Sequence, residues 1–113
     1  MNKTEFNLDA ALAVLERTPA TIRAMLDGLP DSWLTATEGE GTWSPYDVIG
    51  HLIHGERTDW IPRTRHILSD DKRPFAPFDR NAQFIESEGR TITELLSTFA
   101  ELRRENVAAL GSL

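Results

Sequence analysis

The sequence predicts an all-α protein with three long amphipathic helices. Apolar side chains recur every three or four residues in three segments, about residues 7–29, 45–68 and 92–110, and this spacing places them on one face of a helix. Residues that favour helix starts precede the second and third segments. No segment alternates apolar and polar residues as a half-buried strand does, so we expect no sheet.

The first predicted helix carries a heptad-like apolar stripe that runs from Leu8 to Leu29. Asn7 or Asp9 can supply the side-chain oxygen that caps its first turn. Pro19 lies in the middle of the stripe and has no backbone N–H, so we expect a kink or a break just before it.

The second predicted helix follows a loop over residues 29–42, in which Trp33 and Leu34 are expected to anchor the chain to the core. Its start is well marked, because Ser44 is a good N-cap and Pro45 fits the first helical position. Pro62 predicts a kink further along. Apolar residues lie on two sides of this helix, which indicates more than one helical neighbour.

The third predicted helix follows a long connection over residues 69–90, which is rich in proline and phenylalanine. A connection of this length is often functional or crosses from one end of a helical bundle to the other. A short helical turn is possible over residues 81–86. Thr91 and Glu94 form a capping-box pair at the start of the third helix.

The composition is that of an ordinary globular chain, and 113 residues predict one domain over residues 1–113. The net charge of −6 argues against a nucleic-acid partner or an anionic membrane surface. The absence of cysteine excludes disulfides and thiolate ligands. No apolar run approaches the ~20 residues of a membrane span, and residues 1–6 lack the features of a signal peptide, so we expect a cytoplasmic protein.

Histidines are the residues that indicate chemistry. His51 and His54 are three apart on the second predicted helix, so they share a face and can reach one metal ion together, whereas His66 lies three turns further along. The alternative for each is an ordinary histidine that hydrogen-bonds to the backbone or water. Glu56 lies within an apolar seam, so it is either a metal or proton partner or, as we prefer, an ion-pair partner of Arg63 or of an arginine on another helix.

Four stretches of the chain, taken in order, resemble the DinB/YfiT-like family of four-helix-bundle metalloenzymes. They are Leu15 to Pro19 with Met25 to Leu29, Trp43 to Leu52 with Glu56 and Arg63 to Leu68, Phe75 to Asp79, and Phe99 to Arg103. The stretch from Trp43-Ser44 to His51-Leu52 is the most specific of them. The resemblance covers nearly all of the chain and implies an up-down four-helix bundle.

The resemblance also implies a metal site made by three histidines, of which His51 matches one. The other two form a His-x-x-x-His pair on a fourth helix, and no such pair follows the third predicted helix here. The metal implied is a divalent ion, nickel or zinc, and some family members are thiol-dependent transferases or isomerases. His54 and Glu56 are the accessory candidates, and the residues identify no catalytic group and no substrate.

Two hypotheses follow for the function. The first is a metal-dependent enzyme of the transferase or hydrolase kind, whose metal site is incomplete in this chain. The second is a non-catalytic helical module for dimerisation or partner binding. Because three helices leave an apolar seam exposed, we expect a homodimer that completes the bundle; the alternative is a fragment of a longer protein. A site shared by two copies of His51 across a dimer axis is a third possibility.

Overall fold

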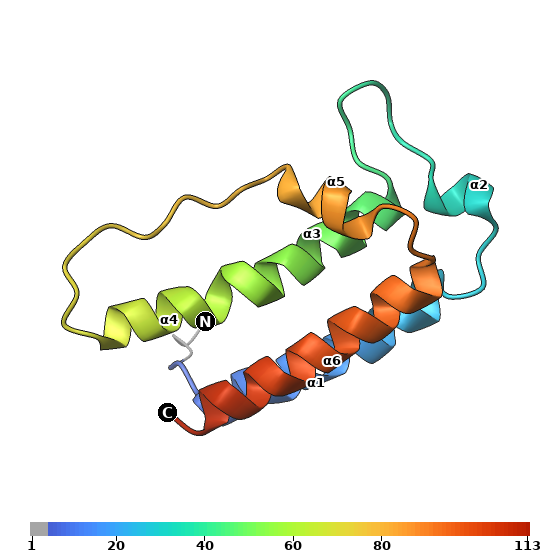
Figure 1. Cartoon of the computed structure of the whole chain (residues 1–113). Coiled ribbons are helices and arrows are strands. Elements are labelled where there is room, and N and C mark those ends of the chain that lie inside the picture. The colour runs from blue at the N-terminus through green and yellow to red at the C-terminus, as the bar shows by residue number, and fades with distance from the viewer. Residues whose placement is uncertain (1–4) are drawn as a thin grey trace.

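The computed structural model describes residues 5–113, and every regular element in this range is a helix (Figure 1). The helices are α1 (Leu8–Leu26), α2 (Asp31–Leu34), α3 (Pro45–Thr58), α4 (Trp60–Leu68), α5 (Ala82–Ser87) and α6 (Ile92–Gly111). The all-α prediction is therefore confirmed. No helix among these residues has both the length and the apolarity needed to cross a bilayer. Most of residues 1–6, on which the signal-peptide argument rests, lie outside the described range.

Helix α6 is central, because it packs against α1 on one side and against α3 on the other (Figure 1). The core lies between α3 and α6, and its fully buried side chains are Ile49, Ile53, Leu95, Leu96 and Phe99. Burial of each of these side chains contributes about 1.5–3 kcal/mol to folding. Helix α1 has no fully buried residue and covers the edge of this core, and α5 packs on α3.

The predicted helix starts are confirmed by their hydrogen bonds. The Ser44 hydroxyl accepts from the Asp47 N–H at 3.2 Å, and the Asp47 carboxylate accepts from the Ser44 N–H at 3.0 Å, so the two residues form a reciprocal capping box. Asn7 caps α1 through the N–H of Ala10 at 3.0 Å. Thr91 caps α6 in the same way. Each cap satisfies an N–H that has no partner inside its helix.

The single helix predicted over residues 45–68 is in fact two helices. Helix α3 ends at Thr58, α4 begins at Trp60, and Asp59 between them has φ −109° and ψ −66°. Pro62 explains the interruption, since it cannot donate to the Thr58 carbonyl and its ring collides with that oxygen. The sequence located the proline, and the structure places the interruption three residues before it.

Pro19 does not break α1, which runs unbroken from Leu8 to Leu26. In a regular helix the N–H of residue 19 would donate to the carbonyl of Leu15. Here the Arg103 side chain of α6 supplies the missing donor, with Nη1 3.1 Å from the Leu15 oxygen. Of the two alternatives predicted at Pro19, a kink or a break, the break is therefore wrong, and a neighbouring helix supplies a donor for the carbonyl that proline leaves open.

Two further differences lie at the end of the first helix. Helix α1 ends at Leu26, before the predicted residue 29, and Gly28 follows with φ +85°, which favours glycine. The predicted loop contains the four-residue helix α2, which is too short to produce periodicity. Leu34 anchors it, at 4% exposure, but Trp33 is 66% exposed and does not.

Candidate metal centre

His51 lies on α3 and contacts Gln83 of α5. The distance from His51 Nδ1 to Gln83 Oε1 is 3.1 Å, and Gln83 is almost completely buried. The Gln83 Nε2 group donates to the backbone carbonyl of Asp47 at 3.0 Å. A carbonyl only accepts, so this bond fixes which end of the amide faces His51. His51 Nδ1 is then the donor, and the lone pair of the neutral ring is on Nε2.

This hydrogen bond gives His51 the tautomer of a metal ligand. A histidine that binds metal through one ring nitrogen almost always donates its other ring N–H to an outer partner, which orients the ring. Gln83 is this outer partner for His51, since its Oε1 accepts from His51 Nδ1. His51 is therefore suited to bind a metal ion through Nε2, as one ligand.

The close approach of α5 to α3 depends on Gly50, next to His51. A Cβ on Gly50 would lie 2.5 Å from the Ser87 hydroxyl oxygen, so the Ser87 side chain or α5 would have to shift to make room for it. The Tyr46 hydroxyl also holds this end of α5, since it is within 2.5 Å of the backbone carbonyls of Ser87 and Arg90. Burial raises the pKa of the Tyr46 hydroxyl above its ordinary value, because it disfavours the charged phenolate. These contacts keep Gln83 against His51.

A cavity of about 460 Å³ lies beside His51. The His51 ring contacts Trp43 and Phe78 there, with ring centroids 4.9 Å and 5.7 Å away. Trp60 and Arg63 of α4 also line the cavity. His51 is thus half-buried at a cavity of ligand size rather than packed into the core.

His54 has a different environment from His51. Its Nδ1 lies 3.2 Å from both carboxylate oxygens of Glu86 on α5, and the residue is 5% exposed. Its ring contacts Phe78, at 4.9 Å, but His54 does not line the cavity beside His51. The two histidines therefore share a neighbour, Phe78, and each takes its own partner from α5.

His66 lies apart from both, as its position in the sequence indicated. Its Nε2 is 2.6 Å from the backbone oxygen of Arg73, in the connection that follows α4. In the same turn, hydrogen bonds from Arg73 lower the pKa of Asp71. His66 is a half-buried residue of the last turn of α4 and links this helix to the connection that follows it.

Glu56 belongs to a buried network on another side of α3. Its Oε1 accepts from Arg103 Nε at 2.6 Å, and its Oε2 accepts from Asn106 Nδ2 at 2.7 Å. The preferred interpretation of Glu56, an ion pair with an arginine of another helix, is confirmed. Arg63 pairs instead with Asp59, at 2.5 Å. Glu56 lines a separate cavity of about 430 Å³ between α1, α3, α4 and α6.

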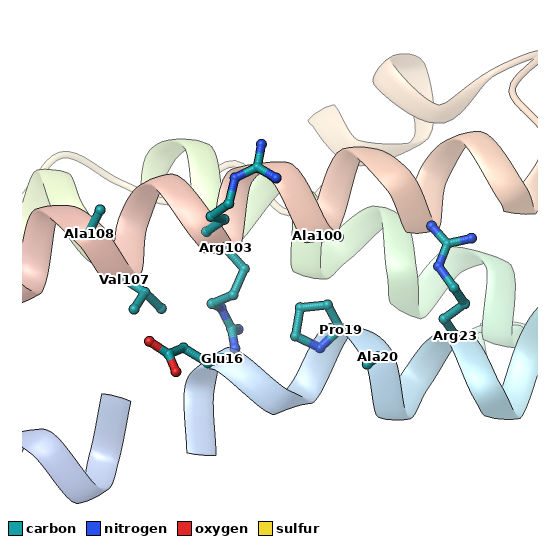
Figure 2. A pocket seen from close by; sticks show the side chains of 9 residues that line it. Glu16, Pro19, Ala20, Arg23, Ala100, Arg103, Val107 and Ala108 are labelled. Atoms are coloured by element: carbon teal, nitrogen blue, oxygen red, sulfur yellow. The ribbon is translucent and has the colours of Figure 1, made fainter. Parts of the chain in front are cut away.

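A third cavity, of about 570 Å³, lies between α1 and α6 and contains no histidine. Figure 2 shows its α1 side, with Glu16 and Arg23 on either side of Pro19 and Ala20. It is larger than the cavity beside His51, but size alone does not indicate a metal site. The residues that indicate chemistry are at the smaller cavity.

The donor set is small. Among residues 5–113, no group of three or more histidine, aspartate or glutamate side chains is placed to hold one metal ion. A zinc site requires three or four ligands. The described residues therefore fit one ligand, His51, and do not form a complete centre.

Comparison with known families identifies the scaffold. The model of the DinB superfamily matches residues 14–113. The chain belongs to the DinB superfamily. A "Putative metal-dependent hydrolase" of Geobacillus thermodenitrificans is 26% identical over 81 residues, which are 72% of this chain and 45% of that protein. This DinB-superfamily chain therefore spans less than half the length of that curated relative.

A solved structure has the same fold. It is that of YfiT from Bacillus subtilis, described as "a probable metal-dependent hydrolase with an unusual four-helix bundle topology". The match has a TM-score of 0.80 at 23% identity and covers all of this chain and 67% of the YfiT chain. The family resemblance predicted from the sequence is confirmed. The match leaves one third of the YfiT chain uncovered.

Proposed function

We propose that this DinB-superfamily chain is the scaffold of a metal-dependent enzyme, of the hydrolase or thiol-dependent transferase kind, in which His51 Nε2 is one ligand of a divalent metal ion. The observation that carries the proposal is the hydrogen-bonded series from the Asp47 carbonyl through Gln83 to His51 Nδ1. It sets the histidine tautomer that a metal requires. The descriptions of both relatives as metal-dependent hydrolases also support it.

The residues of this chain orient the ligand, and the metal supplies the reactivity. His51 Nε2 would hold a nickel or zinc ion as one of its ligands, and such an ion would supply Lewis-acid chemistry when bound. The ligands other than His51 must come from further groups, since the described residues do not place three metal ligands together. His54 is the accessory candidate, because its Nδ1 is also engaged by a residue of α5 and its ring contacts the same Phe78.

Calorimetric titration with Zn²⁺ and with Ni²⁺ tests this proposal. We expect His51→Ala to weaken binding at least tenfold, because it removes the ligand. We expect Gln83→Leu to weaken binding about 10–100-fold, because it removes the group that orients the ring. His66→Ala is the matched control and should change binding less than twofold. Equal binding by wild type and His51→Ala would refute the assignment.

A second candidate, a dimerising helical module, is favoured by the arrangement of the helices. Helix α6 has neighbours on two sides, but the cavity of about 430 Å³ lies open between α1 and α3–α4. Its walls are mostly apolar and include Leu15, Trp60 and Leu110, and Trp60 is 57% exposed. YfiT has a four-helix bundle, of which this chain matches three long helices. A second copy of the chain is our proposed occupant of the fourth position.

Light scattering after size-exclusion chromatography tests the dimer. We expect wild type to elute as a dimer at micromolar concentration and Trp60→Glu to elute as a monomer, because it places a charge on the apolar wall. Trp33→Glu is the matched control, since Trp33 is similarly exposed but lies on α2, away from the cavity. A stable wild-type monomer would exclude this candidate without affecting the metal proposal.

A further inference from the structure

The cavity beside His51 has the size and lining of a small-molecule site. Its volume of about 460 Å³ falls within the usual 300–1,000 Å³ of ligand pockets. Three aromatic side chains, Trp43, Trp60 and Phe78, form much of its wall. Gly55 lines the same cavity, and a Cβ on it would be in van der Waals contact with Trp60 Nε1, at 3.4 Å. This wall suits the flat apolar body of a small organic molecule.

The charged groups of the same cavity are mainly cationic. Arg63 and Arg80 line it together with a single carboxylate, that of Asp59, which is already paired with Arg63. Within residues 5–113, Arg80 has neither an ion pair nor a side-chain hydrogen bond. An excess of positive charge at a cavity is notable in a chain whose net charge is −6. It attracts an anion by direct pairing and by steering.

The two arginines reach the cavity from different segments of the chain, and each carries a guanidinium that can bind a carboxylate. The Arg63 guanidinium is held in place by Asp59 and by the Phe75 ring, whose centroid is 5.0 Å away. Arg80 comes from the connection between α4 and α5, so it reaches the cavity from another segment. A guanidinium binds a carboxylate through two parallel N–H bonds. Trp60 Nε1 adds a donor on the same wall.

We propose that this cavity binds a small aromatic carboxylate, with the carboxylate at Arg80 and Arg63 and the ring between Trp43, Trp60 and Phe78. The assignment goes beyond the proposed metal function and does not depend on it. It requires only side chains that are within the described structure. The ring would also contact the imidazole of His51, so the ligand would lie beside the proposed metal ligand.

The probe is 2-naphthoate, with 2-naphthamide as its uncharged analogue of the same shape, titrated in the presence of EDTA. Shifts of the tryptophan indole N–H resonances in NMR spectra report binding, because Trp43 and Trp60 line the cavity. We expect a Kd on the order of 1 mM or below for 2-naphthoate, the value that a ligand of this size reaches. We expect 2-naphthamide to bind at least fivefold more weakly.

Substitutions distinguish recognition of the carboxylate charge from nonspecific apolar binding. Arg80→Ala should weaken 2-naphthoate binding at least fivefold and leave 2-naphthamide unchanged, and Arg80→Lys should restore part of the loss. Arg65→Ala is the matched control, because Arg65 is an exposed α4 arginine outside this cavity, and it should change binding less than twofold. Equal binding of the two probes, no effect of Arg80→Ala, or no shift of the indole resonances up to 10 mM, about tenfold above the expected Kd, would each overturn the proposal. None of these results depends on metal, so failure here leaves the assignment of His51 to be judged by its own titration.

Discussion

Replacing Arg103 with methionine should be one of the most destabilising single changes in the chain. Arg103 is the ionic partner of Glu56, which is 4% exposed, and it also donates to the Leu15 carbonyl at 3.1 Å. Removing one member of a buried ion pair costs about 3–5 kcal/mol, because the other charge stays buried without its partner. A total stability of about 5–15 kcal/mol is usual for such a domain. The substitution therefore removes a large fraction of it.

Urea unfolding, followed by tryptophan fluorescence, measures this cost. With a slope of about 1–3 kcal/mol per molar urea, the midpoint should fall by more than about 1 M. Arg104→Met is the matched control, since Arg104 is the exposed neighbour on the same helix, and it should stay within about 0.5 kcal/mol of wild type. The double variant Glu56→Gln, Arg103→Met should be more stable than Arg103→Met alone, because no charge is then left unpaired. A cost below about 1 kcal/mol for Arg103→Met would refute the buried network.

Three further predictions concern α3 and the contact of α5 with it. Ser44→Ala removes the α3 cap and should lower the free energy of unfolding by about 1 kcal/mol, measured by urea titration, whereas no loss would show that the cap is dispensable. Gly50→Ala places a Cβ 2.5 Å from the Ser87 hydroxyl oxygen and should cost about 1–3 kcal/mol; it should also weaken metal binding at His51 if α5 is displaced, and a neutral effect would show that the Ser87 side chain rotates away without moving α5. Burial raises the pKa of Tyr46 above its ordinary value of 10.0, so the folded state keeps the proton to higher pH than the unfolded chain does. This stabilisation is complete below about pH 10 and is lost as the pH rises through the folded pKa. Stability measured between pH 8 and 11 should therefore fall less in Tyr46→Phe than in wild type, and parallel curves would exclude this role.

Local signals in the sequence predicted most of the helix boundaries. Ser44 and Thr91 are followed at the right spacing by acidic residues, and this arrangement forms caps whatever the tertiary structure. Pro62 was located correctly, but its effect appears at Asp59, because a proline disturbs the turn that precedes it. Pro19 shows the limit of such local reasoning. The Leu15 carbonyl, which Pro19 leaves without its helical donor, accepts a hydrogen bond from Arg103, 88 positions further along the chain. No periodicity in the sequence can indicate this contact.

The candidate site was predicted only in part, for the same reason. His51 was identified from its motif, but Gln83 was not, since it lies in a six-residue helix without apolar periodicity. The Gln83 partnership depends on Gly50, which lets α5 approach α3. A glycine inside a buried helix face was the one available signal of a close approach there. The role of Arg80 depends on how the connection before α5 returns to the helices, and composition alone does not give this.

The packing of α1 against α6 has a consequence for synthesis on the ribosome. Helix α1 is made first, yet it has no fully buried residue, and its main neighbour, α6, is completed only at Gly111. Synthesis proceeds at about 5–20 residues per second, so the addition of residues 27–111 takes roughly 4–17 s after α1 has been made. During that interval the emerging chain exposes a helix that has nothing to cover it. We therefore expect the docking of α1 against α6 to be a late step of folding.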